Sequence, residues 1–171
     1  MTNPAPRNLP ASVRQKLQNL ARRDNAEFGL ILVKYGLERI LYRLSRSPYR
    51  DVFILKGALL FELWTEQRYR PTRDADFLAR GDNSPERFVR IFRELCTMEV
   101  EPDGLAFDPD TVTAERITED ADYEGVRVTS VLEMPSLRRL WRAPIPRCSN
   151  FPVLACLPIL GRRSPPKNSK R

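Results

Sequence analysis

All 22 acidic residues of this chain lie among its first 133 positions, and none follows Glu133. Residues 1–133 also carry 20 lysines and arginines, whereas residues 134–171 carry nine, together with 7 of the 15 prolines. A segment rich in arginine, proline and serine, without helical or strand periodicity, does not bury enough apolar surface to fold. We therefore predict a folded domain in residues 1–133 and a basic, disordered tail in residues 134–171.

The tail has two possible origins. Its composition, with arginine, proline and serine but no acidic residue, is the one expected when a GC-rich gene is read out of frame. We expect that a frameshift near codon 130 replaced the normal continuation and left the domain incomplete. A genuine disordered basic tail is the alternative. Resequencing of the gene separates the two, because an open second frame with acidic codons that runs past the stop supports the frameshift.

Composition excludes several classes of chemistry. The chain has no histidine, which excludes histidine-activated nucleophiles, histidine proton shuttles and histidine-bound zinc. No stretch approaches the roughly 18 consecutive apolar residues of a membrane span. The three cysteines form no CxxC motif and the N-terminus does not resemble a signal peptide, so we expect reduced thiols and a cytoplasmic location.

Apolar spacing in residues 1–133 predicts an α+β fold, with a mixed β-sheet and flanking helices. Residues 103–104 and 108–109 are typical of turns. Ser12 is the expected N-cap of the first helix. The predicted helices are 12–23, 27–46, 57–66 and 85–98, and the predicted strands are 52–56, 74–79, 111–118 and 125–133.

Two carboxylates occur at strand spacing in "RPTRDADFLARGD", residues 70–82. On a strand, Asp74 and Asp76 would point to the same face and could share magnesium, which prefers oxygen ligands. Other acidic residues two apart also occur in the chain, but they lie in turn-rich acidic segments. The pair at 74 and 76 differs because an apolar strand continues directly from it.

A second motif lies eighteen residues upstream of Asp74, where the predicted strand passes through Lys56-Gly57 into a helix. Glycine at such a junction lets the backbone approach a ligand, and the free N–H groups of a helix start favour phosphate. Lys56 adds a positive charge. Thr72 and Arg73 are further candidates for phosphate contacts.

Taken together, "FILKGALLFELW" and "RYRPTRDADFL" resemble the nucleotidyltransferase toxins of the AbiEii/AbiGii abortive-infection type. The resemblance covers about residues 10–130 and is strongest at 53–78. It implies a nucleotidyltransferase-like fold and a Mg²⁺- or Mn²⁺-dependent enzyme of a toxin–antitoxin system. Such an enzyme transfers a nucleotide from a nucleoside triphosphate (NTP) to an acceptor such as tRNA, and it has a cognate antitoxin.

The resemblance also assigns residue roles. Asp74 and Asp76 would be catalytic and hold the metal, while Lys56, Gly57, Ala58, Thr72 and Arg73 would bind the NTP phosphates. Ala58 stands where the family usually has a second glycine, and its methyl group would crowd the phosphate approach.

One part of the family pattern is missing. The resemblance implies a third carboxylate on a later strand, in an apolar-Asp-apolar setting, and no acidic residue follows Glu133, which itself lacks that setting. We therefore expect this chain to be inactive.

Two other functions are compatible with parts of the sequence. The basic tail predicts a non-enzymatic nucleic-acid binder that makes salt-dependent phosphate contacts. Residues 12–46 allow a helix-turn-helix, although the second helix is too apolar on too many sides to lie in a groove.

Overall fold

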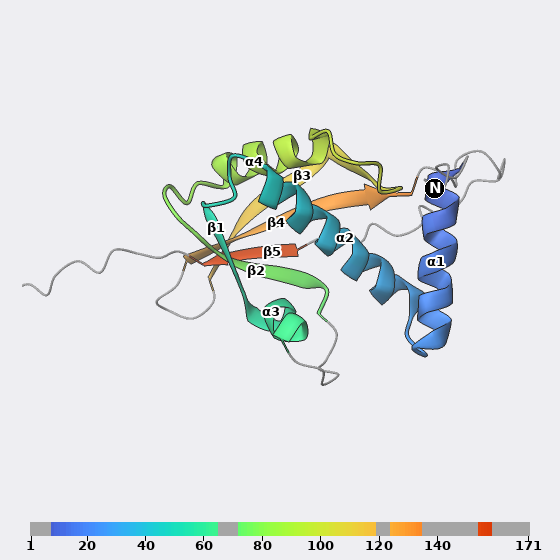
Figure 1. Ribbon diagram of the computed structural model, residues 1–171. Coiled ribbons are helices and arrows are strands. Elements are labelled where there is room, and N and C mark those ends of the chain that lie inside the picture. The colour runs from blue at the N-terminus through green and yellow to red at the C-terminus, as the bar shows by residue number, and fades with distance from the viewer. Residues whose placement is uncertain (1–7, 65–71, 119–123, 135–153, 159–171) are drawn as a thin grey trace, which may run out of the picture.

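Four helices and a mixed five-stranded sheet make up the described part of the chain, residues 8–64, 72–118, 124–134 and 154–158 of a computed structural model (Figure 1). This confirms the predicted α+β class. No helix among these residues is both long and apolar enough to cross a membrane. In chain order the elements are α1 (Leu9–Arg23), α2 (Phe28–Arg46), β1 (Phe53–Lys56), α3 (Gly57–Trp64), β2 (Asp74–Ala79), α4 (Pro85–Thr97), β3 (Ala106–Thr118), β4 (Glu124–Glu133) and β5 (Leu154–Pro158).

The strands lie in the order β1-β2-β5-β4-β3. β2 pairs antiparallel with β1 and parallel with β5, and β4 pairs antiparallel with both β5 and β3. The strand that carries Asp74 and Asp76 therefore lies inside the sheet, with β1 on one side and β5 on the other.

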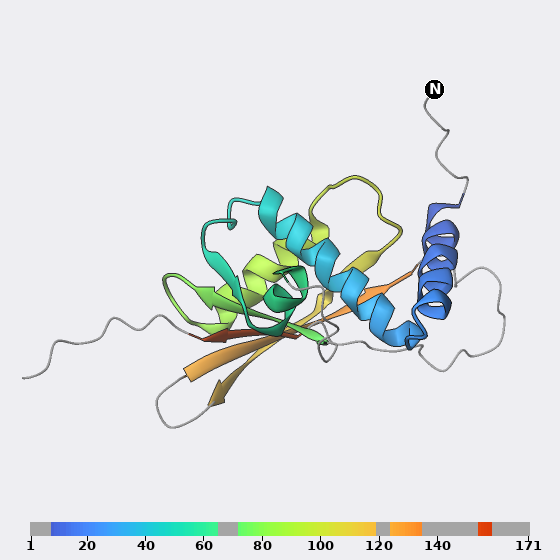
Figure 2. The same ribbon diagram turned by 60° about the horizontal axis from the view of Figure 1, so that its bottom comes forward.

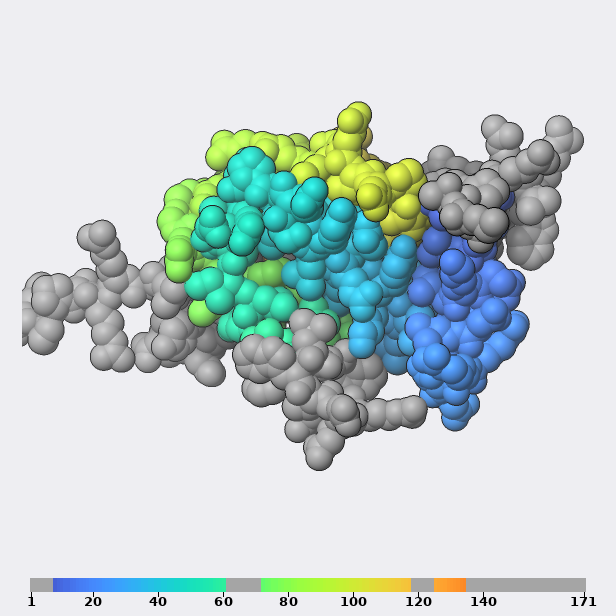
Figure 3. Space-filling model, in the orientation of Figure 1, coloured from blue at the N-terminus to red at the C-terminus, as the bar shows by residue number. Residues whose placement is uncertain are grey.

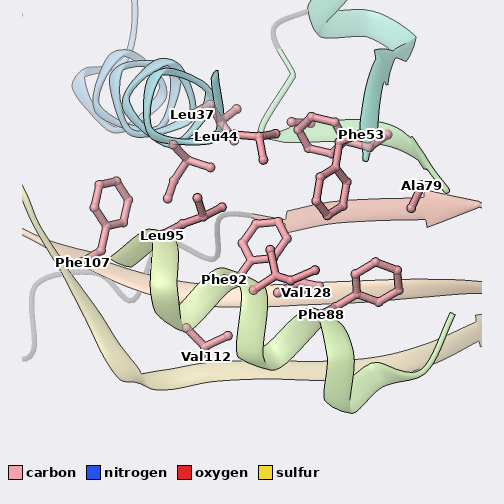
Figure 4. Packing of buried hydrophobic residues seen from close by; sticks show 14 of the residues in the cluster. Leu37, Leu44, Phe53, Ala79, Phe88, Phe92, Leu95, Phe107, Val112 and Val128 are labelled. Carbon is pink, nitrogen blue, oxygen red and sulfur yellow. The ribbon is translucent and has the colours of Figure 1, made fainter. Parts of the chain in front are cut away.

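One face of the sheet is covered by α2 and α4, which pack against each other and enclose the core (Figures 1 and 2). Phe53 of β1 lies at its centre, with its ring 5.7 Å from that of Phe77 and 6.1 Å from those of Phe88 and Phe92. Figure 4 shows Phe88 and Phe92 of α4 between Phe53 and Val128 of β4. Alternate residues of β1, β2 and β4 face this core, so the residues between them face the opposite side.

The opposite side of α2 forms part of the molecular surface, next to α1 (Figure 3). Its inner side is buried, with Leu37 only 1% exposed, and it packs on α4 and on the core. A helix held in the core in this way is unsuited to a DNA groove, which agrees with the argument against a helix-turn-helix in residues 12–46.

The first helix begins three residues earlier than predicted. Ser12 was the predicted N-cap, but Asn8 caps the helix, and its side-chain oxygen accepts a hydrogen bond of 3.2 Å from the Ala11 backbone N–H. Pro10 lies in the first turn, where its missing N–H costs no helical hydrogen bond. The apolar spacing begins at Val13 and therefore gave too late a start. The other three helices and the strands at 52–56 and 74–79 agree with the predictions to within two residues.

A predicted turn at Asp108-Pro109 is instead an irregularity inside β3. The register between β3 and β4 shifts between Asp108 and Thr113. The Asp108 carboxylate accepts a hydrogen bond of 3.0 Å from the Asp110 N–H, and the Thr111 hydroxyl donates to the Asp108 carbonyl at 2.7 Å. These local hydrogen bonds are typical of a turn, but pairing with β4 continues on both sides of them, so the segment is an irregular part of β3.

A strand forms within the segment for which we predicted no regular structure. Residues 154–158 form β5, which fills the position between β2 and β4. The sequence "LACLP" has no polar-apolar alternation, so the period of two that marks a half-buried strand is missing there. The rest of the 134–171 segment lies outside the described residues.

A buried carboxylate joins α2 to the loop before β3. One oxygen of Asp103, Oδ2, accepts hydrogen bonds of 2.8 Å from both Arg39 Nε and Arg43 Nη1. The Tyr35 hydroxyl donates to the Asp103 carbonyl at 2.7 Å, and the Leu105 N–H donates to Oδ1 at 3.0 Å. Residues 60 to 68 positions apart in the sequence are thereby fixed to each other.

Arg43 and Asp103 are both buried, and the Arg43 guanidinium lies over the Phe107 ring at 4.7 Å. A buried ion pair adds little net stability compared with apolar residues, but removal of one partner leaves an uncompensated charge in the core. The network therefore makes the fold sensitive to the loss of Asp103.

We expect Asp103→Asn to lower the free energy of unfolding by about 3–5 kcal/mol, because it leaves the Arg43 charge buried without its carboxylate. Urea denaturation measures this. Asp110→Asn is the matched control: Asp110 is exposed, and we expect a change within about 0.5 kcal/mol. Equal effects of the two substitutions would contradict the role of the network.

The same network predicts a dependence of stability on pH. Burial alone would raise the pKa of Asp103, but the hydrogen bonds from Arg43 and Arg39 outweigh it and hold that pKa below its ordinary value. In the unfolded chain the pKa of Asp103 is about 3.9, so the unfolded state binds the proton more readily than the folded state does. The stability that ionised Asp103 contributes is therefore present above that pH, and it is lost as the pH falls through the lower pKa of the folded state. Denaturation at several pH values below 5 should therefore show a steeper loss in the wild type than in Asp103→Asn. Parallel curves would contradict this.

Candidate functional site

The two predicted metal ligands lie side by side on β2. Ala75 and Phe77 point into the core and are 3% and 2% exposed, whereas Asp74 and Asp76 are half-buried on the other face. We call this second side of the sheet the carboxylate face. The alternation predicted from sequence is confirmed, and it gives both acids a rigid strand as support.

Gly57 approaches Asp76 more closely than any other residue type could. It follows the last residue of β1, begins α3 and has a φ of +75°, a conformation that residues with a side chain rarely adopt. A Cβ added to it would overlap Oδ2 of Asp76 and lie 3.0 Å from Cγ. The strand-to-helix turn therefore lies directly against the carboxylate, which explains why a glycine occupies this position.

Thr72 orients the first carboxylate. Its hydroxyl donates to Oδ1 of Asp74 in a short contact, and it lies 3.2 Å from the Asp74 carbonyl. The Asp74 backbone N–H in turn points to the same hydroxyl at 3.4 Å. Thr72 was predicted to contact phosphate. The observed contacts hold Asp74 at the start of the strand, and the phosphate contact stays a prediction.

The other predicted phosphate ligands are Lys56, Ala58 and Arg73, and they differ in how they lie relative to Asp74 and Asp76. Lys56 is the register partner of Asp76 across the β1–β2 pair, so both lie on the carboxylate face. Ala58 is exposed in the first turn of α3. Arg73 is 60% exposed and forms an ion pair of 3.6 Å with Glu27 at the start of α2. The structure thus brings Lys56, Gly57 and the two acids together, while the Arg73 side chain contacts α2.

The site therefore consists of two carboxylates, a glycine turn at a helix start and a lysine, all at one end of the β1–β2 pair. A family model described as "Nucleotidyl transferase AbiEii toxin, Type IV TA system" matches residues 39–145, more than half of the chain. The chain belongs to this family. No curated protein matches it.

The AbiEii match contains every predicted site residue and extends from α2 through β4. It starts later than the resemblance we described for residues 10–130, and it ends at residue 145, past the predicted domain boundary at 133. Membership of this family of nucleotidyltransferase toxins implies a nucleotide substrate and an antitoxin. The basic tail residues proposed to bind nucleic acid lie outside the described part of the chain.

The donor set fits magnesium in part. Members of nucleotidyltransferase families typically depend on a metal, and Mg²⁺ is commonly held by one or two carboxylates together with substrate phosphates. Asp74 and Asp76 supply the carboxylates on one face. Histidine, cysteine and acidic side chains form no group of three or more anywhere among the described residues, so Asp74 and Asp76 would hold an ion only together with oxygens of a ligand or of water.

Sequence reasoning missed the strand beside the two acids. In the register, Asp74 is opposite Leu154 and Asp76 is opposite Cys156, so β5 occupies the position next to the site and has no carboxylate. Neither the apolar residues of 154–158 nor their spacing indicated this pairing, because parallel partners are set by the three-dimensional fold and not by local sequence.

We expect Gly57→Ala to displace Asp76 and to abolish Mg²⁺-dependent nucleotide binding, because the added methyl group overlaps the carboxylate. Gly81→Ala is the control. Gly81 also has a positive φ, +93°, but its added Cβ would lie 3.4 Å from the flexible end of Arg87.

Both alanine variants should lose about 1–2 kcal/mol from backbone strain, which thermal unfolding would show. Only Gly57→Ala should lose nucleotide binding, measured by isothermal titration calorimetry. Wild-type affinity in a folded Gly57→Ala variant would refute the positioning role.

Proposed function

We propose that this chain carries a nucleotidyltransferase-like site that binds a nucleoside triphosphate with Mg²⁺ or Mn²⁺ and directs it to an RNA acceptor such as tRNA. The observation that carries the proposal is the close approach of the Gly57 turn to Asp76. It places a helix start, suited to phosphate, against a carboxylate pair suited to a metal. Asp74 and Asp76 would hold the ion, while Lys56, Gly57 and Ala58 would face the triphosphate.

The reaction follows from this chemistry. A hydroxyl of the acceptor attacks the α-phosphorus, the bond from that phosphorus to the bridging oxygen breaks, and pyrophosphate leaves. The hydroxyl proton passes to a base, either a carboxylate or water. Mg²⁺, which Asp74 and Asp76 would hold, would neutralise charge on the triphosphate and on the transition state. Lys56 adds a positive charge on the same face, and the rigid strand fixes both carboxylates before the substrate arrives.

The strand next to the site limits the expected activity. The resemblance implies a third carboxylate, and β5, which pairs with β2 beside the acids, contains none. We therefore propose that nucleotide binding survives in this chain while transfer is slow or absent. In this proposal Asp74 and Asp76 suffice for nucleotide binding, whereas rapid transfer would need the missing third carboxylate.

The test is nucleotide binding and transfer by the purified chain, with Mg²⁺, each α-labelled nucleoside triphosphate and total tRNA. We expect Asp74→Asn and Asp76→Asn each to weaken Mg²⁺-dependent binding by at least about tenfold, because each removes a charged ligand. Asp110→Asn, an exposed acid on β3, should bind as the wild type does.

The transfer arm tests the missing carboxylate. Cys156 is the register partner of Asp76, so Cys156→Asp places an acid beside the pair. We expect label on tRNA to rise above the wild-type level in this variant and to vanish when Asp74→Asn is added. A wild type that is folded but binds no triphosphate with Mg²⁺ would overturn the proposed function.

A further inference from the structure

Five residues form a single row across the whole sheet. The register pairs Lys56 of β1 with Asp76 of β2, Asp76 with Cys156 of β5, Cys156 with Arg127 of β4, and Arg127 with Glu115 of β3. Residues directly opposite each other on paired strands belong to the same face. Arg127 is therefore on the carboxylate face, in line with Asp76, although 51 positions separate the two in the sequence.

The burial pattern of β4 supports this placement independently. Val126 and Val128, on either side of Arg127, are 0% and 1% exposed and face the core. Arg127 is 38% exposed and lies on the other side. Of the half-buried or exposed residues that alternate with the core positions on the described part of β4, Arg127 is the one cation, since the others are Thr129, Val131 and Glu133.

The spacing brings the arginine within reach of a ligand at Asp76. β5 alone separates β2 from β4, so at roughly 4.8 Å per strand the Cα atoms of Asp76 and Arg127 are about 10 Å apart. Lys56 is one strand away from Asp76 on the opposite side. A carboxylate that binds a metal-bound phosphate chain thus has a cation on each side in the same row.

We propose that Arg127 binds a phosphate oxyanion of the substrate on the β4 side of Asp76, a role that rests on the proposed function. Arginine suits it because the planar guanidinium binds phosphate through two parallel N–H···O contacts. In the structure its Nη1 donates to Oε1 of Glu115 at 3.3 Å, and Glu115 is 65% exposed. Glu115 holds the guanidinium on this face, in a contact open enough to solvent for a phosphate to replace or share it.

The ordinary alternative is a cross-strand ion pair that serves β3–β4 pairing alone. It predicts that the loss of Arg127 changes stability slightly and anion binding not at all. The two interpretations therefore differ in a binding measurement that does not depend on catalysis.

The experiment measures binding by isothermal titration calorimetry to the full chain and to Arg127→Gln, Arg127→Lys and Arg116→Gln. Arg116 is the matched control, since it neighbours Glu115 on β3 but pairs with the core residue Val126, which places it on the other face. One arm uses inorganic triphosphate with Mg²⁺, and the other uses a short single-stranded RNA without nucleotide. Circular dichroism confirms that each variant is folded.

We expect Arg127→Gln to weaken binding in one arm by at least about tenfold, because it removes a charge-assisted hydrogen bond. Arg127→Lys should bind with intermediate affinity, and Arg116→Gln should bind as the wild type does. Loss in the triphosphate arm assigns Arg127 to the nucleotide, and loss in the RNA arm assigns it to the acceptor. Unchanged binding in both arms, by a wild type that does bind, overturns the inference and leaves the proposed function intact. A wild type that binds neither probe overturns both.

Discussion

The site depends on one close approach, that of the Gly57 turn to the carboxylate of Asp76. No side chain fits between them, so the end of β1, the start of α3 and the second acid of β2 have a fixed geometry. This geometry holds only while β1 and β2 keep their register, in which Lys56 is opposite Asp76. A slip by one residue would turn both acids toward the core, where Phe77 and Ala75 now lie. The buried aromatic cluster around Phe53 resists such a slip, and in this way the core determines the chemistry on the opposite face.

The elements that could be predicted from sequence are those with a strong local signal. β2 was predicted with its observed bounds because an apolar run continues from the two acids in "DADFLA". The start of α4 was predicted because Ser84 and Pro85 are typical of a helix start and precede an amphipathic segment. The failures have physical causes. The start of α1 depends on the Asn8 cap, which precedes the apolar pattern. The Asp108-Pro109 segment has turn chemistry, but long-range pairing overrides it. β5 has no local pattern, since its position comes from its neighbours on both sides.

Local sequence also predicted the candidate site better than its surroundings. The acid pair and the Lys56-Gly57 junction are short motifs whose spacing carries the chemistry, and the structure places them together. Arg127 has no such signal, because a single arginine in "EGVRVTS" has the same appearance as any surface residue of a strand. Only the register across the β2–β5 and β5–β4 pairs puts it in line with Asp76. The same holds for Asp103, one acid among several in its loop, which the fold places between Arg39 and Arg43.

The position of β5 changes how the last part of the chain must be interpreted. A basic tail that only bound nucleic acid would be separable from the domain, and its deletion would leave the carboxylate strand untouched. In the structure, residues 154–158 are the partner of β2 on one side, so their removal would expose the edge of the strand that carries Asp74 and Asp76. Loss of RNA binding after deletion of residues 134–171 would therefore not show that the tail itself binds RNA. Neutralisation of its arginines, with β5 left in place, separates a contact made by the tail from the support that β5 gives to the site.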